Sequence, residues 1–264
     1  MATVVLLHDG SVADLPAATS LAAGLEKRLI AHLAFPLTVT AVSLAAGPTL
    51  TAALAGSGNV ALAVPLEPLW SRQTIQHYRD ALAAAGHPGV EVVGGWQDDE
   101  RLRQAVADRA RSELGGGRFD DTAVLFLADP LPERGGSEYH DLAQRAAAQL
   151  VGVMAPGDWR LAFWRPAVPD PQSGEEAPSA PPPELAALLE WEWPTVLAVS
   201  LAHILPRETD AELDACLAPV VERAGRVYRR APAVSAHPGV LTALADAVVD
   251  HLARRPLPDA GGGR

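Results

Sequence analysis

Two aspartates occupy corresponding places in the sequence, each directly after an apolar, strand-like run. Residues 3–9 read TVVLLHD and residues 123–129 read AVLFLAD, so the runs end in Asp9 and Asp129. A carboxylate can bind a metal ion or accept a proton. In two similar parallel sheets, both side chains would lie at the carboxyl ends of strands, where open α/β folds bind ligands. The alternative for each aspartate is that it caps a turn or the next helix.

Strand-like and helix-like segments alternate along the chain. Short runs rich in β-branched residues predict strands at 3–7, 37–44, 59–65, 90–94, 122–128, 159–164 and 195–201. Apolar residues at helical spacing predict helices near 15–33, 48–55, 71–85, 98–114, 138–151, 208–224 and 238–253. Such alternation is typical of parallel sheets with helices on both faces, because right-handed β-helix-β crossovers stack in that way. We therefore expect an α/β fold.

The repeated pattern of a strand followed by an aspartate predicts two similar domains, each a parallel sheet flanked by helices, with a cleft between them. Three glycines in ELGGGRFDD, residues 113–121, mark the boundary, which gives domains of residues 1–115 and 116–264. Residues 166–184 are rich in proline and lack periodicity, which is typical of a long surface connection. The C-terminal helix could belong to the second domain or pack back on the first.

Composition limits the classes of function. With 264 residues, 48% of them apolar, the chain has enough material for a sizeable core. It contains no apolar run of about 18 residues and no charged flank followed by an apolar signal core, so we expect a soluble, cytoplasmic protein. The formal charge of −11 argues against a nucleic-acid surface. The one cysteine, Cys216, cannot form an intramolecular disulfide or a cysteine cluster, and we expect a core thiol.

Four stretches combine strand ends, aromatic residues and carboxylates in a fixed order. Residues 64–82, VPLEPLWSRQTIQHYRDAL, pass from a strand ending in Pro-Leu through an aromatic and a serine into a helix. Residues 90–106 pass from a strand to a helix led by tryptophan. Residues 124–139 read VLFLADPLPERGGSEY, and residues 195–249 contain the helix start PRETDAELD. In these motifs and in their order, the chain resembles the ferrochelatase family of tetrapyrrole metal chelatases.

Three residues are candidates for the chemistry, two of them through the resemblance. Metal insertion removes two pyrrole N–H protons, strips water from the metal and bends the ring, so it needs a base, a metal ligand and a tight apolar slot. The resemblance implies that Glu208 is retained as a catalytic base, whereas Asp129 stands where the family carries its catalytic histidine. A carboxylate is a weaker base than imidazole. His203 could supply the imidazole or could be a histidine with a structural hydrogen bond. These three residues are the expected metal ligands.

The resemblance also implies which residues hold the substrate. Trp70 and Ser71 match the aromatic and the serine after the Pro-Leu strand, Tyr139 matches the tyrosine of a Gly-Asp-Pro-Tyr stretch, and Trp164 matches a Trp-Gln-Ser segment. Asp9 stands where relatives carry a residue that faces the pocket, often a histidine in the small sirohydrochlorin chelatases. A segment that helps ferrochelatases close over the macrocycle is missing near the N-terminus.

The resemblance therefore implies a ferrochelatase-like enzyme that inserts Fe(II) into protoporphyrin IX or coproporphyrin III, with iron as a substrate and no permanently bound cofactor. A tetrapyrrole is the expected partner and nucleic acid is not. A peripheral membrane contact stays open, as does the choice between a monomer and a homodimer. Two alternatives remain: a protein of this fold that binds a tetrapyrrole or a haem-synthesis partner without turnover, and a structural α/β protein with a closed cleft.

Overall fold

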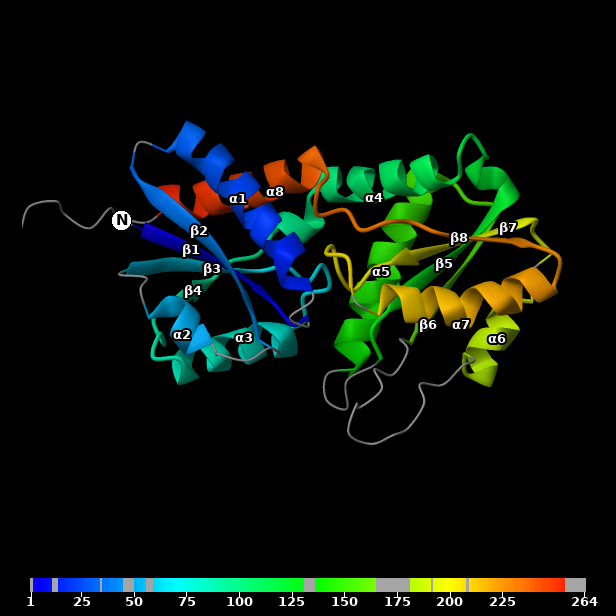
Figure 1. Cartoon of the computed structure of the whole chain (residues 1–264), viewed down its shortest axis with the longest axis horizontal. Helices are drawn as coiled ribbons and strands as arrows, with labels where there is room; N and C mark the ends of the chain where they lie inside the picture. Colours follow the sequence, from blue (N-terminus) through cyan, green and yellow to red (C-terminus); the bar gives the residue numbers. More distant parts are fainter. Residues whose placement is uncertain are drawn as a thin grey trace, which may run out of the picture.

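The computed structural model describes residues 2–10, 14–33, 35–44, 50–55, 59–130, 136–164, 181–190, 192–207 and 209–254. In this part of the chain the strands form two four-stranded parallel sheets, one in each half (Figure 1). Helices flank both sheets. The expected α/β fold with two similar halves is therefore confirmed.

The two sheets share one topology. The first has the order β2-β1-β3-β4 and consists of β1 (Ala2–His8), β2 (Leu37–Ser43), β3 (Asn59–Pro65) and β4 (Glu91–Val92). The second has the order β6-β5-β7-β8 and consists of β5 (Thr122–Ala128), β6 (Asp158–Phe163), β7 (Thr195–Ser200) and β8 (Val227–Arg230). Each strand of the second sheet thus matches the strand four places earlier. Since β1 and β5 are equivalent central strands, Asp9 and Asp129 follow them at equivalent places.

The described helices are α1 (Leu15–His32), α2 (Leu50–Leu54), α3 (Arg72–Ala84), α4 (Glu100–Glu113), α5 (Gly136–Met154), α6 (Pro183–Leu188), α7 (Asp210–Arg223) and α8 (Pro238–Arg254). Short 3-10 turns, η2 (Trp96–Asp98) and η3 (Phe119–Asp121), precede α4 and β5. At the start of α4, Asp99 Oδ1 accepts a hydrogen bond from the Arg101 N–H at 2.8 Å. Such a cap satisfies one of the free N–H groups at a helix start.

The central strands are buried on both faces. Val4, Val5, Leu6 and Leu7 of β1 are completely inaccessible to solvent, and every residue of β5 is buried. Parallel strands covered by helices on both faces are continuous apolar runs for this reason. These strands are consequently the ones that the sequence indicates most clearly.

The sequence does not predict β8 or α6. β8 is an edge strand whose residues alternate between exposed and half-buried, so it lacks an apolar run. α6 begins at Pro183, inside the segment 166–184 that was expected to be a connection. Residues 165–180 lie outside the described residues. Tertiary contacts override local propensity in such short elements; here the Val227 N–H at the start of β8 donates to the Pro194 carbonyl at 2.9 Å.

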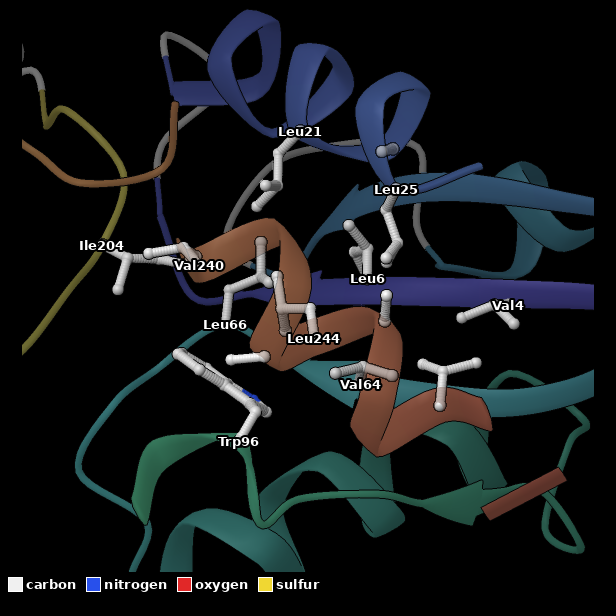
Figure 2. Packing of buried hydrophobic residues seen from close by; sticks show 14 of the residues in the cluster. Val4, Leu6, Leu21, Leu25, Val64, Leu66, Trp96, Ile204, Val240 and Leu244 are labelled. Atoms are coloured by element: carbon white, nitrogen blue, oxygen red, sulfur yellow. The ribbon is translucent and has the colours of Figure 1, made fainter. Parts of the chain in front are cut away.

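The last helix, α8, packs on the first sheet although it follows the second sheet in the chain (Figure 1). Val240, Leu244 and Val248 are fully buried and belong to one core cluster with Leu6 of β1. Figure 2 shows Val240 beside Ile204, which comes from the segment after β7. The core of the first half is therefore completed by residues from the second half.

Helix α4, which follows the first sheet in the chain, contributes side chains to the cores of both halves. Its Leu102 and Ala105 belong to the core of the first sheet, whereas its Ala107 and Ala110 belong to the core of the second. α4 also contacts both α8 and α5. The two halves share these helices, so separating them would expose apolar surface from both cores to water. This packing fixes how the carboxyl ends of the two sheets face each other.

Two expectations from composition concern the environment of Cys216 and the presence of membrane-spanning helices. Cys216 is buried in α7, as expected for a core thiol. None of the described helices combines the length and the apolar composition that crossing a membrane requires.

Replacing Leu244 by alanine is expected to lower the free energy of unfolding by about 2–5 kcal/mol, because this fully buried side chain joins α8 to the first sheet. Urea unfolding followed by circular dichroism measures the change. Asp250→Ala, on the exposed face of the same helix, is the matched control, with a change within about 0.5 kcal/mol. A Leu244→Ala protein as stable as the wild type would contradict a structural role for α8 in the first half.

Candidate functional site

A cavity of about 300 Å³ lies between the two halves, at the carboxyl ends of the strands. Charged residues from both sheets line it: Asp9 follows β1, Glu67 lies two residues after β3, Asp129 follows β5, and Arg207 lies in the segment after β7. The other lining residues are Leu69, Ser71, Gln73, Thr74, His77, Tyr78, Pro130, Tyr139 and Ala202. Open α/β sheets bind ligands at this edge, so this cavity is the candidate functional site.

The structure brings four of the sequence-predicted site residues to this one cavity: Asp9, Ser71, Asp129 and Tyr139. Asp9 and Ser71 come from the first half of the chain, and Asp129 and Tyr139 come from the second. The equivalent places of the two aspartates in the sequence thus correspond to a shared place in space.

Three other predicted residues lie elsewhere. Trp164 and His203 line a smaller pocket of about 30 Å³, to which Asp129 also contributes. Trp70 lies outside both linings, because its ring packs on Gly94. A Cβ added to Gly94 would lie 1.6 Å from that ring, so the close approach requires glycine.

Glu208, to which the resemblance assigns the role of base, lies outside the described residues. Within the part of the chain that the structure describes, no group of three or more His, Cys, Asp or Glu side chains is arranged to hold a metal ion. The metal-facing roles of Asp129 and His203 stay predictions.

Glu67 is the main residue that the sequence analysis missed. Its Oε1 accepts a hydrogen bond from the Asp9 N–H at 2.9 Å, and its Oε2 accepts one from the Tyr78 hydroxyl. Burial raises the pKa of Glu67, and these two hydrogen bonds oppose the rise in part. Burial and the neighbouring Glu67 charge raise the pKa of Tyr78, so the tyrosine stays protonated and acts as the donor. A sequence signal exists, since NVALAVPLE is a third strand-like run followed by a carboxylate.

Buried groups hold the turn that carries Asp9. His8 is only 2% exposed, and its Nδ1 accepts a hydrogen bond from the Gly10 N–H at 3.2 Å. The Ser43 hydroxyl donates to the Gly10 carbonyl. Burial lowers the pKa of His8, with a smaller opposing effect of Asp14, so the imidazole is neutral at pH 7. A Cβ on Gly10 would lie 2.2 Å from Asp14 Oδ2, so the Asp14 side chain would have to move to admit a larger residue here.

Tyr139 holds the corresponding turn after β5. The Asp129 N–H donates a hydrogen bond to the Tyr139 hydroxyl at 3.2 Å. Tyr139 is 8% exposed, and its ring lies 6.3 Å from that of Phe163, measured between centroids. Tyr139 therefore orients the backbone of Asp129 at the wall of the cavity.

Arg207 joins the two halves across the cavity. Its Nη1 donates a hydrogen bond to the Asp9 carbonyl at 3.1 Å, and its backbone N–H donates to Asp210 Oδ2 at 3.1 Å. Among the described lining residues, it is the one arginine or lysine. Its positive charge therefore lies in the same cavity as Asp9, Glu67 and Asp129. Arg207 lies in the stretch PRETDAELD, directly before Glu208, but nothing in that stretch indicates a contact with Asp9.

His203 has partners at both ring nitrogens. Its Nδ1 lies 3.2 Å from Ser200 Oγ, and its Nε2 lies 3.6 Å from Asp210 Oδ1. The other oxygen of Asp210 lies 3.3 Å from Arg230 Nη1. Burial raises the pKa of Asp210, but hydrogen bonds from His203 and a backbone N–H, together with the Arg230 charge, outweigh it and lower that pKa. This arrangement agrees with the alternative of a histidine in a structural hydrogen-bond network.

Ser71 contributes to the wall of the cavity as a helix cap. Its Oγ accepts a hydrogen bond from the Thr74 N–H at 3.1 Å at the start of α3, and the residue is 3% exposed. The Arg72 N–H, next in the chain, donates to the Glu138 carboxylate at 3.4 Å. Glu138 lies in the first turn of α5. The starts of α3 and α5, one from each half, therefore lie together beside the cavity.

No family model and no curated protein sequence matches the chain. Several solved structures are similar to it. CbiX, the terminal enzyme for biosynthesis of siroheme in denitrifying bacteria, gives a TM-score of 0.64 at 17% identity, over 95% of this chain and 99% of its own. The sirohydrochlorin chelatase SirB from Bacillus subtilis subspecies spizizenii, in complex with cobalt, gives 0.60 at 15% identity over 94% of each chain.

A third similar structure, DR2241 from Deinococcus radiodurans, is a multi-domain protein with structural similarity to chelatases. It gives a TM-score of 0.58 at 20% identity, over 100% of this chain and 57% of its own. At such identities, the likeness establishes the fold alone. The predicted chelatase-like arrangement of two α/β halves is confirmed. Of these neighbours, SirB is described as a sirohydrochlorin chelatase and CbiX as an enzyme of siroheme biosynthesis.

Replacing Glu67 by glutamine is expected to change how stability depends on pH. Since the folded protein holds the Glu67 proton more tightly than the unfolded chain, this group favours folding at low pH. Its contribution is lost as the pH rises from the ordinary value of 4.5 through the raised pKa in the folded state. The free energy of unfolding of Glu67→Gln should therefore fall less between pH 5 and 8 than that of the wild type.

Urea unfolding at several pH values measures this difference. Glu222→Gln, an exposed residue of α7, is the control and should follow the wild type at every pH. Identical pH dependence in Glu67→Gln and in the wild type would contradict the buried state of this carboxyl group.

Proposed function

We propose that the chain inserts a divalent metal ion into a tetrapyrrole in the cavity between its two halves. The observation that carries this proposal is the convergence of three carboxylates, Asp9, Glu67 and Asp129, from three strand ends on one cavity. The likeness in fold to SirB, whose structure holds cobalt, and to CbiX supports it.

The reaction needs a group that hands over the metal and a group that accepts protons. In our proposal Asp129 is the metal-facing carboxylate, because it lies at the wall shared by the large cavity and the smaller pocket of His203. Carboxylate oxygens suit a divalent ion that must be released again into a nitrogen ligand set. Glu208 is the base that the resemblance implies.

We propose sirohydrochlorin as the tetrapyrrole. The cavity lining includes Gln73, His77 and Arg207, whose side chains can donate hydrogen bonds. Sirohydrochlorin carries many more carboxylates than protoporphyrin IX and would use such donors. The narrower assignment from the sequence resemblance, Fe(II) insertion into protoporphyrin IX or coproporphyrin III, is the second substrate class to test.

One observation favours a second function, in which the protein binds a tetrapyrrole without turnover. Arg207 places a positive charge in the cavity, and Asp129 replaces the histidine that the ferrochelatase resemblance implies. A fixed cation near the carboxylates opposes the approach of a divalent metal ion. Arg207 would instead pair with a carboxylate of the macrocycle.

Purified protein with sirohydrochlorin and Co(II) or Fe(II) under anaerobic conditions should form the metallated product, followed by absorbance. Asp129→Asn should lower kcat/KM at least about tenfold, since a metal-facing carboxylate is lost. Asp141→Asn, an exposed aspartate of α5, is the matched control and should leave kcat/KM unchanged. An absorbance shift without product would support binding without turnover, and the absence of both would contradict a tetrapyrrole site.

Replacing Asp129 by histidine should raise kcat/KM, because imidazole is the stronger base near neutral pH and a good ligand for divalent iron and cobalt. The same absorbance assay measures it. An Asp129→His protein that is less active than Asp129→Asn would contradict the correspondence between Asp129 and the family's histidine.

A further inference from the structure

We propose that Glu67 is a catalytic residue of this cavity: it accepts one of the two pyrrole N–H protons that the ring loses as the metal enters, and Tyr78 is its positioning residue. This inference rests on the proposed function. It adds a proton acceptor from the first half of the chain to the cavity that Asp129 lines from the second half.

Two hydrogen bonds fix the backbone at the end of β3, directly before Glu67. The Leu66 N–H donates to the Leu7 carbonyl at 2.8 Å, which extends the pairing of β3 with β1. The Trp96 indole N–H donates to the Pro65 carbonyl at 3.1 Å. Trp96 is 1% exposed and belongs to the core that α8 completes, so this support is rigid (Figure 2). A catalytic group held by the sheet keeps its place through the reaction.

The side chain of Glu67 is oriented by two donors. The Asp9 N–H binds Oε1 and the Tyr78 hydroxyl binds Oε2. An ionised carboxylate has about four acceptor sites on its two oxygens, so it can accept a substrate N–H in addition to these donors. Tyr78 is 1% exposed on α3, which prevents its hydroxyl from turning away. The Glu67 carboxylate therefore lies at the cavity wall, and the Asp9 N–H and the buried Tyr78 hydroxyl set its orientation.

The charged and titratable groups around Glu67 come from three elements. Asp9 lies after β1, Tyr78 and His77 lie on α3, and Arg207 reaches in from the segment after β7. Burial raises the pKa of Glu67 against the opposing hydrogen bonds and the Arg207 charge. A carboxylate of this kind is a stronger base than an ordinary glutamate.

The proton balance is simple. The N–H bond of one pyrrole breaks, its electron pair stays on nitrogen to bind the metal, and the proton bonds to a Glu67 oxygen. The second pyrrole proton passes to another base or to water. Glu67 returns its proton to water after the product leaves, because the cavity opens to solvent. No oxidant or reductant takes part.

The test measures kcat/KM against pH, and tetrapyrrole binding by absorbance, for the wild type and for variants of this pair. Glu67→Gln keeps the shape of the side chain and one acceptor oxygen for the Asp9 N–H, and its NH2 group can donate to the Tyr78 oxygen, so it should fold and bind the tetrapyrrole as the wild type does. It should lose about 100-fold or more in kcat and should lose the acidic limb of the pH profile. Glu67→Asp should recover part of the rate. Glu222→Gln on α7 is the control and should match the wild type.

Tyr78→Phe provides an independent readout. Because the tyrosine hydroxyl favours the ionised carboxylate, its removal should move the acidic limb of kcat/KM to higher pH while tetrapyrrole binding stays unchanged. A merely structural role for the tyrosine would lower binding or stability without moving this limb.

Three outcomes would overturn the inference. Wild-type turnover together with an unchanged rate and pH profile in Glu67→Gln would show that Glu67 is not the proton acceptor, and the proposed function would stand. A loss of tetrapyrrole binding in Glu67→Gln equal to the loss of kcat/KM would make it a binding residue. A wild-type protein that binds but never metallates a tetrapyrrole would overturn the inference together with the proposed function.

Discussion

The packing of α8 on the first sheet determines how the two halves of the molecule face each other. Val240, Leu244 and Val248 bury their side chains in the core that contains β1, and α4 carries apolar residues into both cores. Apolar burial of this kind is the main favourable term in folding, so it holds the two sheets in one arrangement. The cavity between their carboxyl ends depends on that arrangement, because its walls come from both halves.

In our proposal, the charges in the cavity take over the handling of the metal ion from the histidine that the ferrochelatase resemblance implies. Three carboxylates line the cavity with one arginine, and each carboxylate has a different surrounding. Glu67 accepts two hydrogen bonds and is the base that we propose, whereas Asp129 lies where this cavity meets the smaller pocket of His203. Arg207 binds the Asp9 carbonyl and reduces the repulsion among the acids. Neighbouring acids with different surroundings can take different roles in one reaction.

The buried parallel strands and the aspartates after β1 and β5 could be predicted from the sequence, because both faces of these strands are covered and the runs are continuously apolar. β8 and α6 could not, since short edge elements depend on contacts rather than on a local pattern. Glu67 had a readable signal in a third strand followed by a carboxylate. Arg207 lies in the motif PRETDAELD, but its place in the cavity could not be predicted, because only the tertiary arrangement brings the segment after β7 to Asp9.

Hydrogen–deuterium exchange of the full chain with and without sirohydrochlorin tests most directly that the tetrapyrrole binds between the two halves. The cavity is lined by residues within segment 67–78 of the first half and, after β7, by residues within segment 202–207 of the second. Binding should slow exchange in both segments together. Protection confined to the separate polar groove of Asp99, Asp246 and His251, or no protection in either cavity segment, would contradict a site between the sheets.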